Sequence, residues 1–457
     1  MTRLMRMDWP EGGTPDLPPG FTLAEAEARL AATRVAMTAR GHAALVVYGD
    51  REHAANLHWL TGFDPRFEEA VLVIGPDAAH LLAGNECLAW TEVSPLVQAG
   101  HVRPVHCASL SLPSQPRGGA RLSDLLAPLV PRGARIGVAG WKWFGPDEVD
   151  DPATALDVPA FLADPLRARA GRAENATDLF QHPGHGLRAR IGAADIARLE
   201  FANHMAAAAL KRMVFAFREG MTDFAAIEAA RIGGLPLGCH ATFATGARAH
   251  LGLSGPSGER LELGQPVSFN IAHWGANICR AGWLARGAED LPVAAGDYFE
   301  AFVLPYLAAM SDWCGLMRPG VAGGAVWARM QEILPYETFG ISLNPGHLIG
   351  LEEWVSSPIY EGSDISLASG MAMQMDVIPG HTIYGSTRME DGYVLADDDL
   401  RAELTARFPN VARRIEVRAR FMRDQIGMDV PDTLLPLADT CGILAPWLLD
   451  PAQVAAL

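Results

Sequence analysis

The sequence predicts two domains, an α/β domain followed by an α+β domain. At 457 residues the chain exceeds the size at which a single hydrophobic core keeps growing, so two domains are expected. Short strand-like segments alternate with helical segments in the first 180 residues, as in α/β proteins. After a change of composition at residues 166–190, helices and strands follow in a different order that is typical of an α+β domain.

The charge balance bears on the class of partner. The chain has 37 basic and 53 acidic side chains, which gives a formal net charge of -16. Nucleic acids and anionic membrane surfaces bind positive patches, so we expect neither of them as a partner. The longest apolar runs are strand-sized and far too short to span a bilayer. A small-molecule substrate fits this composition best.

The cysteines and the first residues favour a cytoplasmic protein. No two cysteines lie close in the sequence as a metal or redox pair would, and residues 1–6 lack an apolar signal region. A reducing compartment agrees with both observations. The six cysteines are Cys87, Cys107, Cys239, Cys279, Cys314 and Cys441.

The first domain is predicted over residues 1–180. Residues 1–20 are rich in Pro and Gly and predict an irregular arm, and Thr22 is the expected cap of a helix that Gly41 ends. Residues 56–64, which include Phe63, are interpreted as a polar and aromatic loop between the first two strands. The expected strands are residues 44–48, 71–74, 79–83 and 135–139.

The second domain is predicted over residues 181–400, followed by a C-terminal extension over residues 401–457. Apolar residues at helical spacing predict a long helix at residues 193–219, and a shorter one capped by Thr222 follows. The extension contains a basic amphipathic helix at residues 411–426 and is expected to cover a domain or a dimer face. Further strands are expected at residues 241–245, 267–271 and 298–304, and a further helix at residues 326–334.

The candidate catalytic residues His347, Asp376 and Glu390 follow one another at intervals of 29 and 14 residues. Each lies in an apolar or glycine-flanked segment, as expected for strands that bring side chains into one pocket. Imidazole and carboxylate groups serve equally as metal ligands and as proton-transfer groups. Asn270 and His250 are further polar candidates upstream.

These segments resemble those of the pita-bread fold family, which includes aminopeptidase P, prolidase, methionine aminopeptidase and creatinase. Residues 346–351 match the family's histidine turn, residues 370–376 match a Gly-Met strand that carries a ligand, and residues 388–391 match an R-x-E-D strand. The resemblance covers residues 30–400. It implies a creatinase-type α/β N-terminal domain and an α+β pita-bread catalytic domain.

The chain departs from the metallopeptidases of that family, in which five ligands hold two metal ions. Asn270 and Ala281 stand at the expected positions of two aspartates, Asp376 replaces a glutamate, and Trp354 stands where a histidine is usual. Two adjacent divalent cations would lack the negative charge that holds them. A dinuclear metal site is therefore not expected, and no metal ligand is predicted.

Creatinase resembles this chain at the same positions and cleaves a carbon–nitrogen bond without metal. This resemblance implies that His250 transfers the proton. The acids Asp376 and Glu390 can bind a cationic or amidino group and stabilise the charge that develops, and His347 is a further catalytic candidate. Asn270 and the aromatic residues Trp283, Trp354 and Phe63 are the predicted substrate-binding residues. Creatine itself is not the expected substrate, because Trp283 falls near the position of the glutamate that grips its guanidino group.

Three hypotheses remain open from the sequence. The first is a metal-independent hydrolase that acts on a carbon–nitrogen bond of a small polar molecule and needs no cofactor. The second is an enzyme with one divalent transition metal at His347, Asp376 and Glu390, either a peptidase that cleaves before proline or a carbon–sulfur lyase. The third is a non-catalytic binding protein. The resemblance also implies a homodimer in which residues 56–67 of one chain close the pocket of the other.

Overall fold

The computed structural model describes residues 3–457, and these form two compact units. Gly20–Ala189 form the smaller unit, while the residues before Gly20 and Arg190–Leu457 form the larger one. The boundary predicted at residue 180 therefore falls at residue 189. The predicted C-terminal extension over residues 401–457 belongs to the larger unit.

The smaller unit is built on a six-stranded mixed sheet with the strand order β5-β4-β3-β2-β6-β7. The four strands predicted from the sequence are confirmed as β2, β3, β4 and β6. Side chains of β2 alternate between two hydrophobic clusters, with Leu45 and Val47 in one and Val46 and Tyr48 in the other. The strands are β2 (Leu45–Gly49), β3 (Ala70–Ile74), β4 (Ala79–Ala83), β5 (Val102–His106), β6 (Arg135–Ala139) and β7 (Arg172–Asn175).

The first helix of this unit begins where the sequence predicts. Thr22 accepts a hydrogen bond from the Glu25 backbone and the Glu25 side chain accepts one from Thr22, which is a complete capping box. The predicted loop over residues 56–64 is wrong in its first part, because this segment forms α2 and buries Leu57 and Leu60. The helices are α1 (Leu23–Ala39), α2 (Ala55–Thr61), α3 (Cys87–Trp90), α4 (Pro95–Gln98), α5 (Leu122–Leu126), α6 (Ala160–Arg169) and α7 (Asp178–Gln181).

The larger unit contains a seven-stranded sheet in which β11-β12-β13-β10-β9-β8 are neighbours in that order and β14 also pairs with β13. A separate two-stranded sheet joins the chain's beginning to its end, since β1 pairs with β15. The strands are β1 (Arg3–Arg6), β8 (Phe243–Thr245), β9 (Pro266–His273), β10 (Ala276–Trp283), β11 (His347–Leu348), β12 (Ala372–Met375), β13 (Arg388–Leu395), β14 (Leu434–Pro436) and β15 (Gln453–Ala456).

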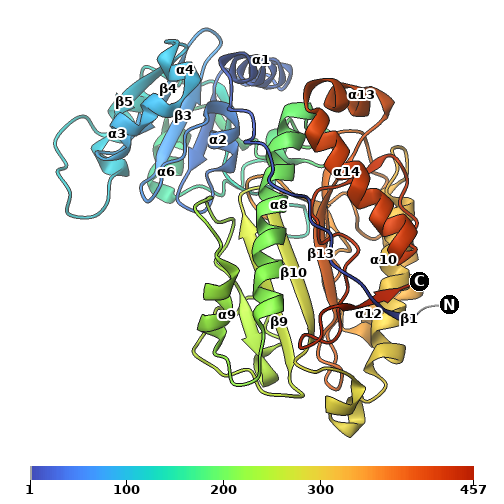
Figure 1. Cartoon of the computed structure of the whole chain (residues 1–457). Coiled ribbons are helices and arrows are strands. Elements are labelled where there is room, and N and C mark those ends of the chain that lie inside the picture. Colours follow the sequence, from blue (N-terminus) through green and yellow to red (C-terminus); the bar gives the residue numbers. More distant parts are fainter. Residues whose placement is uncertain (1–2) are drawn as a thin grey trace. The chain divides into compact units, whose positions relative to one another are not determined.

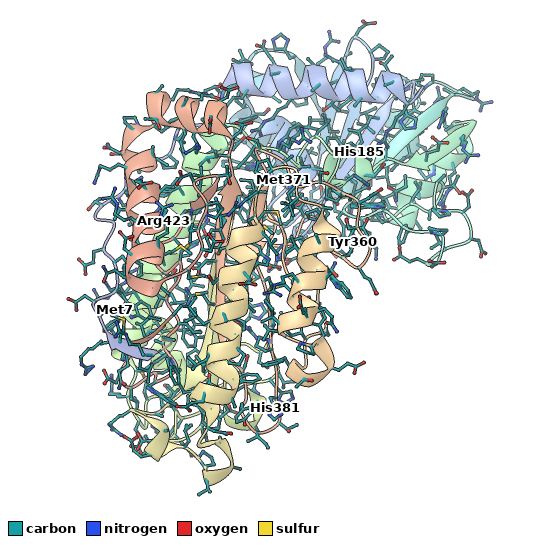
Figure 2. The ribbon with its side chains drawn as sticks, turned by 90° about the vertical axis from the view of Figure 1, so that its right-hand side faces the viewer. Met7, His185, Tyr360, Met371, His381 and Arg423 are labelled. Carbon is teal, nitrogen blue, oxygen red and sulfur yellow. The ribbon has the colours of Figure 1, made fainter. Side chains whose placement is uncertain are left out.

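Two similar helix pairs accompany this sheet. In the first, α8 (Ala193–Ala216) leads to α9 (Asp223–Ala230), and in the second, α10 (Leu304–Leu316) leads to α11 (Gly323–Ile333). Each turn uses a glycine with positive φ, 79° at Gly220 and 93° at Gly320. Figure 1 shows α8 along β9 and β10, and Figure 2 shows α10 and α11 side by side. The larger unit thus contains two related halves.

The strand predicted at residues 298–304 is wrong. Phe299–Val303 form a π-helical turn that continues into α10, whose Tyr306, Met310 and Trp313 are all fully buried. A helix that is buried on most of its sides lacks the amphipathic period, and its aromatic and β-branched residues then resemble a strand. The predicted helix at residues 326–334 is confirmed as α11, and α12 (Tyr336–Phe339) follows it.

The C-terminal helices are fixed to the larger unit by buried charge. The predicted basic helix is confirmed as α14 (Pro409–Phe421) with a π-helical continuation over Met422–Ile426, and α13 (Asp398–Arg407) precedes it. Arg414 and Arg418 of α14 both bond to the carboxylate of Glu200 on α8, each at 2.7 Å. All three side chains are almost fully buried. No helix within residues 3–457 combines the length and the apolar composition needed to cross a bilayer.

Candidate active site

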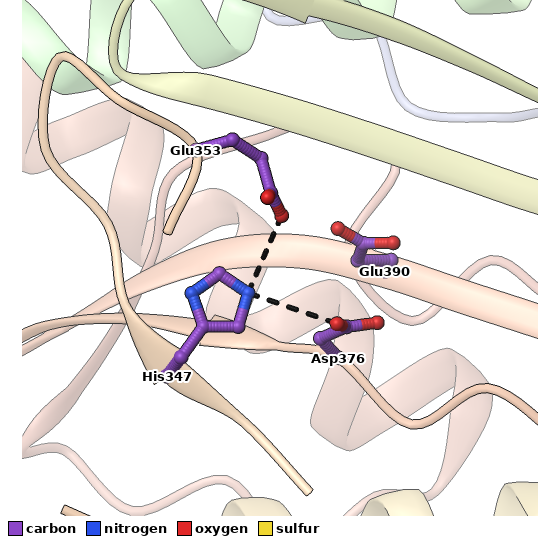
Figure 3. Close-up of side chains that lie close together, drawn as sticks. All are labelled: His347, Glu353, Asp376 and Glu390. Atoms are coloured by element: carbon purple, nitrogen blue, oxygen red, sulfur yellow. Dashed lines mark ion pairs between the residues drawn. The ribbon is translucent and has the colours of Figure 1, made fainter. Parts of the chain in front are cut away.

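Four side chains from the larger unit converge on one point (Figure 3). His347 lies on β11, Asp376 directly follows β12, Glu390 lies on β13, and Glu353 lies in the turn after β11. One ligand atom from each lies within 4.8 Å of the others. The sheet explains the meeting, because β12 pairs with β11 on one side and with β13 on the other. The predicted grouping of His347, Asp376 and Glu390 is thus what the structure contains.

The histidine turn holds the imidazole in one orientation. Gly346 has φ 121°, and a Cβ there would lie 2.9 Å from the backbone oxygen of Gln374, so the turn requires glycine. Nδ1 of His347 lies 3.2 Å from the backbone oxygen of Leu348, to which it can donate. Nε2 lies 3.4 Å from Glu353 Oε1 and 3.7 Å from Asp376 Oδ2. Burial lowers the pKa of His347, but the hydrogen bond and charge of Glu353 and the charge of Asp376 outweigh burial and raise it, so a protonated Nε2 pairs with these carboxylates.

The three carboxylates repel one another in a buried place. Burial, together with the charges of Asp376 and Glu353, raises the pKa of Glu390 well above its usual range. Burial and the charge of Glu353 also raise the pKa of Asp376. Burial acts in the same direction on Glu353, but the hydrogen bond and charge of His347 outweigh it and lower the pKa of Glu353. A positive charge among the four groups would remove the need for these protons.

A buried polar atom without a partner points into this site. Asp376 Oδ1 is buried and has no hydrogen-bond partner among residues 3–457, and the buried His347 Nε2 has only its ion-pair contacts with Glu353 and Asp376. Buried polar atoms normally find partners, so the position of this oxygen indicates a ligand. One imidazole and three carboxylates form a donor set that suits a divalent transition metal such as Mn²⁺, Fe²⁺ or Zn²⁺. The residues present therefore fit one metal ion, which is not part of this structure.

An amide network lies beside the carboxylates. Nδ2 of Asn277 is 2.9 Å from Glu390 Oε1, and Nδ2 of Asn270 is 2.9 Å from Oδ1 of Asn277. Gln374 donates through Nε2 to the same Glu390 oxygen at 3.2 Å. Asn270 therefore lies next to the site and contacts another amide rather than the four-residue cluster directly, and its predicted role in substrate binding stays a prediction.

Sequence reasoning missed Asn277 and Glu353. The hairpin between β9 and β10 turns over only Trp274 and Gly275, which brings Asn277 back beside Asn270. The expected counterpart, Ala281, lies further along β10, opposite Ser268. The short Trp-Gly turn was the available signal for Asn277. In the sequence, Glu353 is one of two adjacent acids after the histidine turn, and nothing in the pattern distinguishes it from Glu352.

Arg388 is a buried cation at the same site. It lies two residues before Glu390 on β13 and therefore on the same face of the strand, and it is 6% exposed. Its charge opposes the increase in the pKa of both Asp376 and Glu390. Its Nε has no hydrogen-bond partner among the described residues. The sequence analysis used Arg388 only as part of a motif.

Three of the remaining predicted site residues lie elsewhere. His250 is exposed in a turn after β8, and no hydrogen bond or ion pair within residues 3–457 joins it to the four-residue cluster. Phe63 is fully buried in the core of the smaller unit. Trp283 is buried at the far end of β10, where it packs against Tyr298 and donates to the backbone of Tyr384. The structure thus does not bring His250, Phe63 or Trp283 to the four-residue cluster.

Trp354, a predicted substrate-binding residue, lies beside His347. Its ring stacks on the imidazole of His347, with 4.0 Å between centroids and 24° between planes. The side chain is 38% exposed, so one aromatic face remains open to the solvent side of the site. An exposed indole beside buried ligands offers a flat apolar surface to a bound molecule.

Comparison with solved structures identifies the fold. The dipeptidase PepE from Mycobacterium ulcerans matches with a TM-score of 0.61 and 21% identity, covering 83% of this chain and 95% of that one. The prolidase from Pyrococcus horikoshii matches with a TM-score of 0.63 and 14% identity, covering 81% and 95%. The N-terminal domain of the FACT complex subunit SPT16 from chickpea (Cicer arietinum) matches with a TM-score of 0.59 and 14% identity, covering 83% and 96%.

No family model and no curated protein sequence matches the chain. The structural matches cover more than four fifths of it, and they include prolidases and dipeptidases at low sequence identity. The resemblance inferred from the sequence is therefore confirmed for the fold. The chain therefore has the pita-bread fold of these structures, with one compact unit over Gly20–Ala189 and a second that contains Arg190–Leu457.

Proposed function

We propose that this protein is a hydrolase that cleaves a carbon–nitrogen bond of a small polar molecule with the help of one divalent metal ion. The observation that supports this most is the convergence of His347, Glu353, Asp376 and Glu390 within 4.8 Å, with a buried Asp376 oxygen that lacks a hydrogen-bond partner among the described residues. Buried carboxylates at this density need a positive charge among them. Glu353 thus joins His347, Asp376 and Glu390, the three ligands of the one-metal alternative from the sequence.

The structural neighbours favour a hydrolase without settling the substrate. Several of them are named as prolidases, dipeptidases or an X-Pro aminopeptidase, all of which cleave carbon–nitrogen bonds. Another neighbour of similar score is named only as a subunit of a complex. A fold is shared by proteins with different functions, so the argument for catalysis has to come from the site itself.

The four residues have different roles in this proposal because they differ in burial. His347 and Asp376 are almost fully enclosed and hold their orientation through β11 and β12, while Glu390 is held by the neighbouring amides. The bound cation would polarise a carbonyl group and lower the pKa of a water molecule. Glu353 has 31% of its side chain exposed, so it is the group through which a proton can pass between solvent and the site.

The surroundings suggest the substrate class. The buried Arg388 guanidinium offers a hydrogen-bond donor that no described residue uses, and a carboxylate is the natural partner for it. Trp354 presents an exposed aromatic face beside His347. We therefore infer a small molecule that carries an amide-type bond, an anionic group and an apolar portion.

The other hypotheses drawn from the sequence differ in how well the structure supports them. A metal-free mechanism with His250 as proton-transfer group loses its support, because that histidine is exposed and outside the cluster. A carbon–sulfur lyase would use the same single-cation site, so only the reaction product separates it from a hydrolase. The homodimer and the cytoplasmic location remain predictions. If a dimer forms, residues other than the buried Phe63 must face the partner's pocket.

The test compares metal dependence with two histidine variants. Protein purified without an affinity metal column is treated with a chelator, reloaded with Mn²⁺, Fe²⁺ or Zn²⁺, and assayed on N-acyl amino acids and dipeptides. We expect hydrolysis only after reloading, and a loss of at least about 100-fold in kcat/KM for His347→Ala. The matched variant His106→Ala changes an exposed histidine of the smaller unit and should retain activity. Turnover that survives chelation, or that is lost in His250→Ala, would contradict the proposal.

A further inference from the structure

We infer that Asn277 and Gln374 are positioning residues that replace a second cation, so that this site accepts one metal ion only. This inference rests on the proposed function. It starts from Glu390 Oε1, which accepts hydrogen bonds from Asn277 Nδ2 at 2.9 Å and from Gln374 Nε2 at 3.2 Å. A carboxylate oxygen has two lone pairs, so these donors occupy the oxygen and leave Oε2 for the cation.

The orientation of the Asn277 amide is fixed by a chain of hydrogen bonds. The backbone N–H of Thr242 donates to Asn270 Oδ1 at 2.6 Å, which places Asn270 Nδ2 toward Asn277. Asn270 Nδ2 then donates to Asn277 Oδ1 at 2.9 Å, so the Asn277 Nδ2 group must face Glu390. The same nitrogen lies 3.4 Å from Glu353 Oε1. The hydrogen-bond network thereby decides which atom of each amide is the oxygen and which is the nitrogen.

Gln374 is fixed in a similar way. It lies opposite His347 in the ladder between β11 and β12, and it is fully buried. Its Nε2 also bonds to the backbone oxygen of Asn277 on β10, across β13. The amide therefore ties the two segments on either side of Glu390 together. This holds the Glu390 carboxylate in one position whether or not a cation is bound.

The consequence concerns charge. A second cation beside Glu390 would need carboxylate oxygens from β9 and β10, where this chain has the neutral amides of Asn270 and Asn277. The Asn277 N–H groups already supply partial positive charge to Glu390 and Glu353 at that place. Replacing both amides by carboxylates would turn these attractions into repulsions that a second divalent cation can relieve.

The experiment counts metal ions rather than activity. Wild-type protein, Asn277→Asp and the double variant N270D/N277D are saturated with Mn²⁺, dialysed, and analysed for bound metal by plasma mass spectrometry and calorimetric titration. We expect one equivalent in the wild type, more than one in N277D, and two in N270D/N277D. The matched variant Asn85→Asp adds the same charge to the smaller unit and should stay at one equivalent.

The outcomes separate this inference from the proposed function. Two equivalents in the wild type would overturn the single-ion inference while leaving a metal-dependent hydrolase intact. No bound metal in the wild type would overturn the proposed function and this inference with it. If N270D/N277D does not fold, as judged by circular dichroism, N277D alone decides, and a value of one equivalent in that folded variant would overturn the inference.

Discussion

Glu353 Oε1 lies 3.4 Å from Nε2 of His347, and five residues separate the two in the chain. The turn between them brings a carboxylate from the solvent side to a histidine that is fully buried. Neither of the two asparagines on β9 and β10 can supply that charge. Glu353 therefore gives the site a third carboxylate, beside those of Asp376 and Glu390.

The ligand role of Glu353 predicts weaker cation binding in Glu353→Gln. Removing one charged ligand of four should weaken the affinity for Mn²⁺ by roughly 10- to 100-fold, because the amide keeps the size but not the charge. Calorimetric titration measures this change. The control Glu361→Gln removes an exposed acid near the same segment and should bind as the wild type does. Equal affinities in both variants would place Glu353 outside the metal site.

The unused donor of Arg388 predicts weaker substrate binding when this side chain is replaced. In Arg388→Met the anionic group of the substrate loses its donor, and KM should rise by roughly 10- to 100-fold, since hydrogen bonds to charged groups contribute about 1.5 to 3 kcal/mol. The effect should be small for analogues in which the carboxylate is amidated. Steady-state kinetics on such a pair of substrates checks this. An equal rise for both analogues would show that Arg388 supports the fold rather than the substrate.

The buried ion pairs of Glu200 with Arg414 and Arg418 predict that removing the Glu200 charge destabilises the larger unit. In Glu200→Gln, Arg414 would keep its buried charge without its paired carboxylate, while Arg418 would keep its ion pair with Asp439 at 2.6 Å. The free energy of unfolding should fall by about 3 kcal/mol. Urea unfolding followed by tryptophan fluorescence measures the change. Glu416→Gln breaks only surface pairs with Arg420 and Arg423 and should change stability by less than about 1 kcal/mol. A similar small change for Glu200→Gln would mean that α14 is loosely attached.

Glu174 predicts a pH dependence of the smaller unit. Burial would raise its pKa, but hydrogen bonds from Arg135, His42 and Arg172 outweigh burial and lower the pKa to about 2. A pKa that is lower in the folded protein stabilises the fold above the ordinary value of 4.5, and this contribution is lost as the pH falls from 4.5 to about 2.

The measurement for Glu174 compares the wild type with Glu174→Gln. We expect a difference in the free energy of unfolding on the order of 2 kcal/mol at pH 6 to 7, and a smaller difference at pH 3. Urea titrations of both proteins at several pH values give these differences. If the difference in the free energy of unfolding did not depend on pH, the charge of Glu174 would not be the source of its stabilising effect.

Much of the fold follows from local sequence patterns. The strand at residues 79–83 and the Thr22 and Thr222 helix caps were predicted correctly, because burial on alternate sides and capping chemistry leave direct signals. The strand predicted at residues 298–304 was wrong because α10 is apolar on most of its surface. The arm before residue 20 and the C-terminal strand β15 could not be joined from sequence, since their pairing spans almost the whole chain.

The site was predictable where its residues belong to compact motifs. His347, Asp376 and Glu390 were found because each lies in a short segment with glycines or acids at fixed spacing. Asn277 was missed because its position depends on the length of a hairpin, and Glu353 because its direction depends on the path of a turn. His250 was chosen by its place in the sequence, but it lies in an exposed turn outside the cluster.

The most direct test of the central claim is a crystal structure of metal-loaded protein with anomalous diffraction recorded at the absorption edge of the metal. The account predicts one anomalous peak, bound by Nε2 of His347 and by carboxylate oxygens of Glu353, Asp376 and Glu390. A site without a peak after saturation, or a peak that Glu353 does not contact, would contradict it.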